Sequence, residues 1–228
     1  MAAGPGDAIV RVDADGPVAT VTLNRPDKKN ALSIALRDAV SDALDALAEA
    51  DEIRTVVFTG EGGVFSAGFD LGEFADPSPE HQARLWASSD RFHHAVLQFP
   101  LPTIAAIDGP ALAGGFDLAC LTDIRIASTR ARFAHPEQQW APVVYRPLLH
   151  LVGASAANDL AFTGRSIDAN EALRLGLVSE VVAPDRLAAL ARERADQIAA
   201  APRDVLVAMK AKAIEARAID PTTPTLGL

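Results

Sequence analysis

Apolar and polar positions alternate along the first part of the chain in a way that predicts a hairpin followed by a helix. Residues 8–12 and 18–23 are apolar runs of strand length, and residues 13–17 between them are rich in turn formers. Residues 24–27 interrupt the second strand, and Ser33 then stands where it can cap a long amphipathic helix. The apolar stripe of that helix consists of Leu36, Val40, Leu44 and Leu47.

Strands and helices alternate through the middle of the chain. Residues 55–59 are β-branched and are followed by Gly60, a pattern typical of a buried parallel strand. Alternation of this kind implies parallel strands joined by crossover helices. Further strands are predicted at residues 103–107 and 124–127, with helices at residues 79–99 and 114–121. Beyond Glu137 the pattern is mostly helical, with helices expected at residues 155–162, 168–175, 184–200 and 202–218.

Two glycine-bearing loops carry the clearest functional signal. Residues 65–71 (FSAGFDL) and residues 109–117 (GPALAGGFD) each follow a short apolar run, and the second loop opens a helix. A backbone N–H at a strand end and another at a helix N-terminus can converge on one carbonyl oxygen that gains negative charge. Two ordinary strand-to-helix turns are the alternative, but the presence of both loops favours an enzyme that stabilises an oxyanion.

Composition narrows the class of protein. A chain of 228 residues with 49% hydrophobic content can bury one sizeable core, so we expect one domain with a small appendage. The net charge of −9 argues against nucleic acid or an anionic membrane as a partner, and an anionic ligand must then be met by local positive charge. The single cysteine, Cys120, excludes an internal disulfide and cannot form a metal cluster alone, so we expect a buried core residue and no metal site.

The N-terminal residues 1–7 are small and acidic and lack the basic-then-apolar order of a signal peptide. No apolar stretch approaches the roughly 20 residues of a membrane span. We therefore expect a soluble, cytoplasmic protein in a reducing compartment.

Several ordered motifs together resemble the crotonase (enoyl-CoA hydratase/isomerase) superfamily over nearly the whole chain. Beside the two glycine loops these are NRP at 24–26, NALS at 30–33, DIRIA at 123–127, HPE at 135–137, TGR at 163–165 and GLV at 176–178. The resemblance implies an α/β fold, a crotonase-like spiral of ββα units over residues 1–185 with a helical C-terminal region at residues 186–228. It also implies a homotrimer or dimer of trimers that acts on acyl-CoA thioesters, with no cofactor beyond coenzyme A.

The resemblance also implies the catalytic residues. It places the oxyanion donors at the N–H groups of Phe69 and Gly114, and the acid/base carboxylates at Asp117 and Glu137. Asp117 is a departure, because hydratases usually have glutamate there, and aspartate is one methylene shorter. The alternatives are a helix-start carboxylate at Asp117 and an ordinary surface residue at Glu137.

Substrate contacts are expected at further positions. Lys28 and Lys29 are candidates for coenzyme A phosphates, with a solvated lysine pair as the alternative. Asp70 is expected to order its loop or to lie next to the ligand rather than to carry a proton. Trp140 either walls an acyl pocket or packs in the core, and His93 and His94 are expected at the surface or at an interface. The remaining expected substrate contacts are Ala31, Ala67 and Leu71.

Three functions remain open from the sequence. The leading one is an enoyl-CoA hydratase that uses Asp117 and Glu137, and the second is an enoyl-CoA isomerase that uses Glu137 alone. The third is an acyl-CoA-binding protein without turnover, since the segment after Glu137 and the C-terminal region are short compared with typical members. A peptidase is disfavoured because Ser66 is not in a Gly-x-Ser-x-Gly turn.

Overall fold

A computed structural model describes residues 8–220 and 222–228 of the chain. The N-terminal residues 1–7, for which no signal peptide is expected, lie outside this described part. Within it, no helix combines the length and the apolar character needed to cross a membrane.

The predicted hairpin forms one edge of the larger sheet. β1 (Val10–Asp15) and β2 (Val18–Leu23) pair antiparallel around Gly16, which has a φ of 58°. The remaining strands of this sheet add in parallel in the order β1-β2-β3-β4-β6-β9. They are β3 (Thr55–Gly60), β4 (Thr103–Ile107), β6 (Ile124–Ser128) and β9 (Glu180–Val182). The parallel pairing inferred from strand–helix alternation is therefore confirmed.

A smaller sheet follows the larger one and contains short strands that the apolar pattern did not predict. β5 and β7 pair parallel, and β7 and β8 pair antiparallel. These strands are too short for a two-residue period to be visible in the sequence. Their bounds are Pro110–Leu112 for β5, Arg132–Ala134 for β7 and Ile167–Asp168 for β8.

Three of the helices begin at a side chain that caps them. The Ser33 side chain accepts a hydrogen bond from the N–H of Leu36 at the start of α1, and Ser78 caps α2 in the same way. Asp168 caps α5. The helices are α1 (Ile34–Glu49), α2 (Pro79–Leu97), α3 (Gly114–Leu121), α4 (Arg146–Thr163), α5 (Ala169–Arg174), α6 (Pro184–Ala199) and α7 (Arg203–Arg217).

One helix differs clearly from the sequence prediction. α4 begins at Arg146, well before residue 155, and it contains Gly153 at a non-helical φ of 75°. Pro147 favours a first helical turn because its ring fixes φ and its missing N–H is not needed there. Gly153 then interrupts the helical periodicity, so the apolar pattern predicts a helix only in the second half of α4.

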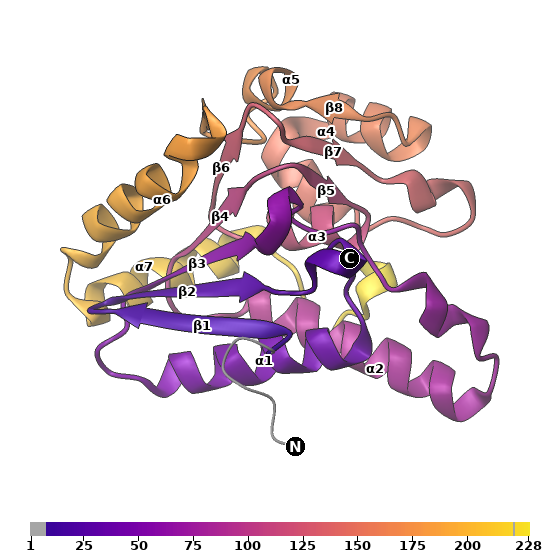
Figure 1. The fold of residues 1–228 in the computed structure, drawn as a ribbon, viewed down its shortest axis with the longest axis horizontal. Coiled ribbons are helices and arrows are strands. Elements are labelled where there is room, and N and C mark those ends of the chain that lie inside the picture. Colours follow the sequence, from indigo (N-terminus) through magenta and orange to yellow (C-terminus); the bar gives the residue numbers. More distant parts are fainter. Residues whose placement is uncertain (1–7, 221) are drawn as a thin grey trace.

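Helices cover both faces of the larger sheet (Figure 1). On one face, α1 and α2 pack against each other, and the main core extends from them to α3 and α4. On the other face, α6 packs against β2, β3, β4 and β6, and a second apolar cluster fills that layer. Cys120 lies in the main core at 4% exposure, as expected, and burial raises the pKa of its thiol. This α/β architecture brings the ends of the strands, and the two glycine loops, to the start of α3.

Candidate active site

The loop at residues 65–71 is shaped by Gly68. Its φ of 90° is rarely adopted by L-residues, and a Cβ added there would lie 2.7 Å from the Cβ of Ala113 and 2.8 Å from the carbonyl oxygen of Leu112. The N–H of Leu32 donates to the carbonyl oxygen of Gly68 at 2.8 Å, which fixes the loop against the start of the first helical unit. The backbone therefore turns at Gly68 immediately before the N–H of Phe69.

The second donor is the first residue of α3. A Cβ added to Gly114 would lie 2.8 Å from the Phe69 ring, so this position needs glycine. A Cβ added to Gly68 would lie 3.3 Å from the Gly114 nitrogen, which shows how closely the two loops approach each other. Two hydrogen bonds of Ser66 join the two loops. The N–H of Ser66 donates to the carbonyl oxygen of Pro110 at 3.1 Å, and the N–H of Leu112 donates to the carbonyl oxygen of Ser66 at 2.9 Å. Among the described residues, no group accepts from the N–H of Phe69 or Gly114. Two unused donors thus lie side by side at the positive end of a helix.

The two predicted carboxylates lie on either side of a histidine. Asp117 is in the first turn of α3 and is 5% exposed, and Glu137 is in η4 (Pro136–Gln139) with a side-chain exposure of 17%. The Nδ1 atom of His135 is 2.9 Å from Glu137 Oε1 and 3.7 Å from Asp117 Oδ1. The structure therefore brings Asp117 and Glu137 together, and the alternative of Glu137 as a freely exposed surface residue is wrong.

His135 belongs to the motif that identified Glu137, but sequence reasoning gave it no role. Its side chain is fully buried, and its ring packs against Phe116 with a centroid distance of 4.6 Å. Burial alone would lower the pKa of His135, but the hydrogen bond to Glu137 and the charges of Asp117 and Glu137 outweigh it, so the pKa is raised.

The expectation that His93 lies at the surface or at an interface is wrong. Its side chain is 0% exposed, and its Nε2 atom lies 3.9 Å from Asp117 Oδ2. Its Nδ1 atom is 2.8 Å from the carbonyl oxygen of Ser89, which can only accept, so Nδ1 carries a proton. The signal was present in the sequence, since His93 shares the helical stripe of α2 with the buried residues Leu85, Phe92 and Val96. His94, by contrast, is only half-buried.

Unpaired polar atoms are concentrated in this cluster. Buried side-chain atoms are almost always hydrogen-bonded, and leaving one unpaired costs about 1–3 kcal/mol. The buried side-chain atoms found without a partner in the described part of the chain are His93 Nε2, Asp117 Oδ1, His135 Nε2 and Glu137 Oε2. All four belong to one cluster near the donors of Phe69 and Gly114. Such an arrangement can bind a carbonyl oxygen and move protons beside it.

Arg37 packs against Phe69 of the loop at residues 65–71, and the sequence did not indicate this contact. It is fully buried, its Cζ lies 4.4 Å from the centre of the Phe69 ring, and it donates to the carbonyl oxygens of Leu32 and Leu85. Burial lowers the pKa of its guanidinium, although Glu73 and Asp38 oppose this. A cation over the ring face fixes the side chain of Phe69 and thereby its backbone.

Asp70 orders its loop, one of the two roles expected from the sequence. Its Oδ2 atom accepts from both terminal nitrogens of Arg25 at 3.1 Å, and its Oδ1 atom accepts from the N–H of Gly72. Arg25 also donates to the carbonyl oxygen of Ala31, and the N–H of Ala67 donates to Lys29 O. Ala31, Ala67, Asp70 and the lysine pair therefore lie in one group of loops beside the donor of Phe69.

The other expected substrate contacts are on the surface. Lys28 and Lys29 are exposed, and neither forms an ion pair with another described residue. Leu71 is 70% exposed and Trp140 is 66% exposed. Core packing, one of the two alternatives for Trp140, is therefore wrong. Trp140 follows Glu137 in the chain, and its N–H donates to the Glu137 carbonyl oxygen at 2.9 Å.

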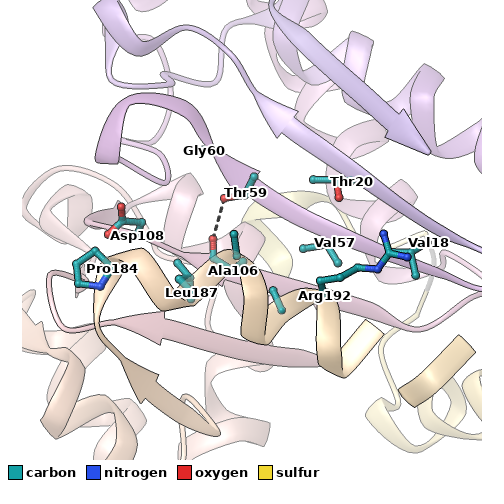
Figure 2. A pocket seen from close by; sticks show the side chains of 12 residues that line it. Val18, Thr20, Val57, Thr59, Gly60, Ala106, Asp108, Pro184, Leu187 and Arg192 are labelled. Atoms are coloured by element: carbon teal, nitrogen blue, oxygen red, sulfur yellow. Dashed lines mark hydrogen bonds between the residues drawn. The ribbon is translucent and has the colours of Figure 1, made fainter. Parts of the chain in front are cut away.

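A groove elsewhere on the molecule contains none of these residues. Figure 2 shows that it lies between α6 and the sheet, with Leu187 and Arg192 on one side and Val57 on the other. Part of its wall belongs to the apolar layer that α6 covers, and Thr59 Oγ1 donates to Ala106 O within it. The groove has apolar packing but lacks the buried unpaired atoms of the cluster around Asp117.

Comparison with known proteins identifies the class to which this fold and site belong. Residues 13–225 match the family described as "Enoyl-CoA hydratase/isomerase". The chain therefore belongs to the enoyl-CoA hydratase/isomerase family of the crotonase superfamily, and it is an enzyme of the crotonase type.

Particular relatives agree with this assignment. A putative enoyl-CoA hydratase of Thermus thermophilus is 38% identical over 190 residues, covering 81% of this chain and 75% of the relative. A short-chain-enoyl-CoA hydratase of Clostridium acetobutylicum is 35% identical, covering 83% of this chain and 74% of the relative. The crystal structure of an enoyl-CoA hydratase from Bacillus anthracis superimposes with a TM-score of 0.88 at 33% identity, covering 93% of this chain and 85% of that one. The crotonase-like fold expected from the motifs is confirmed.

Proposed function

We propose that this protein adds water across the double bond of 2-enoyl-CoA thioesters. The observation that carries the proposal is the pair of unused donors, Phe69 N–H and Gly114 N–H, next to a buried carboxylate pair with free oxygens. A thioester carbonyl held by both donors becomes an enolate oxygen when the β-carbon is attacked, and the donors stabilise that charge. Two relatives that carry the name enoyl-CoA hydratase support the same reaction.

Each carboxylate has a distinct task in this reaction. Asp117 orients the attacking water, whose oxygen bonds to the β-carbon as the carbon–carbon double bond shifts toward the thioester. Glu137 takes the proton released by that water and delivers it to the α-carbon, which restores the carbonyl. The free Oε2 atom of Glu137 is the oxygen available for this transfer, since Oε1 is held by His135.

Coenzyme A recognition is proposed at the exposed lysine pair. Lys28 and Lys29 supply positive charge in a protein of net charge −9, next to the loops that hold the Phe69 donor. Phosphate groups of coenzyme A are suitable partners for such ammonium groups. Because the thioester carries both the phosphates and the carbonyl, we expect crotonyl-CoA to bind and free crotonate to be ignored. Equal affinities for both in titration calorimetry would contradict this.

The proposal is tested by measuring crotonyl-CoA hydration in the wild type and in three variants of the two carboxylates. We expect the wild type to hydrate crotonyl-CoA and Glu137→Gln to lose the activity, because an amide keeps the shape but cannot carry the proton. Asp117→Asn should abolish hydration, and Asp117→Glu should preserve or improve it. The readout is the loss of conjugated-thioester absorbance with product analysis, and wild-type rates in Glu137→Gln would overturn the site assignment.

Double-bond migration is the second candidate, favoured by one specific observation. Of the two carboxylates, Glu137 has one oxygen hydrogen-bonded to His135 and the other without a partner. Moving a proton between two carbons needs only one such base. If isomerisation is the reaction, Asp117→Asn spares conversion of 3-hexenoyl-CoA while Glu137→Gln abolishes it. Binding of crotonyl-CoA with neither reaction would instead identify an acyl-CoA-binding protein without turnover.

A further inference from the structure

His135 occupies a position that neither carboxylate mechanism uses. It lies between Asp117 of α3 and Glu137 of η4, with Nδ1 facing both, and its side chain is fully enclosed. On the far side of Asp117, the other carboxylate oxygen faces His93 of α2 at 3.9 Å. The ring of Phe116 packs against the His135 ring. These are the titratable and charged groups that face His135 from the neighbouring elements.

Asp117 and Glu137 both face His135 in a largely buried site, so their like charges repel each other where little water screens them. A positive charge placed between them removes this repulsion, and the N–H that points at Glu137 is where that charge would be held. His135 is the only histidine, lysine or arginine recorded in contact with both Asp117 and Glu137 in the described part of the chain.

We propose that His135 is a positioning residue that stays an imidazolium and keeps Asp117 and Glu137 ionised together. Its Nδ1–H holds Glu137 Oε1, so that Oε2 is the oxygen presented to substrate. No proton leaves His135 during turnover: the attacking water supplies the hydroxyl group for the β-carbon and, through Glu137, the proton for the α-carbon. The kinetic part of this inference rests on the proposed function, and the protonation state of His135 does not.

The direct test follows the five histidine side chains by NMR titration of the free protein, with His135→Asn used to assign the signals. We expect His135 to be doubly protonated at neutral pH and to titrate above the ordinary histidine value of about 6.5. The midpoint should fall in Glu137→Gln, which removes one of the two charges. A midpoint below neutral pH in the wild type overturns the proposal, whether or not the protein hydrates enoyl-CoA.

A kinetic test separates charge from shape. Asparagine can place its side-chain N–H close to where Nδ1–H lies, so His135→Asn keeps a donor for Glu137 but loses the charge. In this variant we expect the acidic limb of the pH profile of kcat to move up by about one pH unit. At a pH below that limb, kcat should then be about tenfold lower than in the wild type. KM should change little. A wild-type pH profile in His135→Asn would show a structural role only and overturn the proposal.

The matched control is His150→Asn. His150 is exposed on α4, and no contact with the cluster is recorded for it, so both the NMR midpoint of His135 and the pH profile should remain those of the wild type. If the wild type shows no hydration but His135 titrates high, the proposed function fails while the inference about the cluster holds.

Discussion

Gly68 shows how one residue without a side chain determines the geometry of the donor pair. Its φ of 90° and the absence of a Cβ allow the backbone to pass within contact distance of Ala113 and Leu112. In Gly68→Ala the new methyl group meets both, and the strained backbone adds about 1–2 kcal/mol. Because the neighbouring N–H of Phe69 is displaced, we expect kcat/KM to fall by about 10²-fold and the thermal midpoint to decrease.

The matched control for this substitution is Gly16→Ala in the hairpin turn. Gly16 also has a positive φ, of 58°, but a Cβ there would meet nothing within 4 Å. It should therefore lower stability by the backbone strain alone and leave kcat/KM unchanged. Enzyme assays and thermal unfolding of both variants decide the matter, and equal kcat/KM for Gly68→Ala and wild type would contradict the role given to the loop.

Some site residues can be read from the sequence and others cannot. The glycine loops and the residues Asp117 and Glu137 were found because their motifs have a fixed order along the chain. His93, His135 and Arg37 were given no catalytic role, because the sequence does not show which side chains the fold places beside a histidine or an arginine. Asp117 comes from α3, His93 from α2 and His135 from the end of β7, and only the fold brings them together.

At the scale of the elements, α7 is attached to the sheet by a buried ion pair. Lys210 is 4% exposed, and its Nζ lies 2.6 and 2.7 Å from the two oxygens of Asp123, which also accepts from Arg217 and from Thr103. Burial lowers the pKa of Lys210, although the charge of Asp123 opposes this. Asp123 therefore supplies the partner charge for the buried ammonium group.

This pair should respond asymmetrically to substitution. Asp123→Asn leaves a buried charge without its partner, and we expect a loss of about 3–5 kcal/mol in the free energy of unfolding. Lys210→Met removes the charge and fills the same space, and it should be close to neutral because Arg217 still contacts Asp123. Denaturant unfolding of both variants tests this, and equal losses in the free energy of unfolding would contradict the expected asymmetry.

Element boundaries show the same limits as the site residues. α3 was predicted at its observed bounds because it starts at a glycine motif and its residues are apolar apart from Asp117 in the first turn. α4 was predicted only in its second half because Gly153 interrupts its period, and β5, β7, β8 and β9 are too short to show any. Long elements with capping residues can be predicted from the local sequence. Short strands cannot, because they form only where a neighbouring strand supplies hydrogen-bond partners.

At the scale of the whole molecule, the assembly remains a prediction. We expect a trimer or a dimer of trimers, as the motifs imply, and several large apolar side chains remain exposed on the single chain. Away from the candidate site these include Phe162, Val205 and Met209. Burying such side chains between copies gains about 25 cal/mol per Å² of apolar surface. Light scattering at micromolar concentration tests this, and a mass near the 23.9 kDa of one chain would refute it.

The hydrogen bonds of Ser66 have a consequence for how a ligand can reach the donors. Pro110 and Leu112 are tied to Ser66 on one side of Gly114, and Leu32 is tied to Gly68 next to Phe69. Spreading the two donors apart would break several of these bonds at once, at a net cost of about 1 kcal/mol each. These bonds hold the two donors at a fixed separation, whereas exposed side chains around them, such as Leu71, have no such restraint. Under the proposed function, we expect acyl groups of different size to be accommodated at this entrance while the thioester carbonyl meets the same two N–H groups.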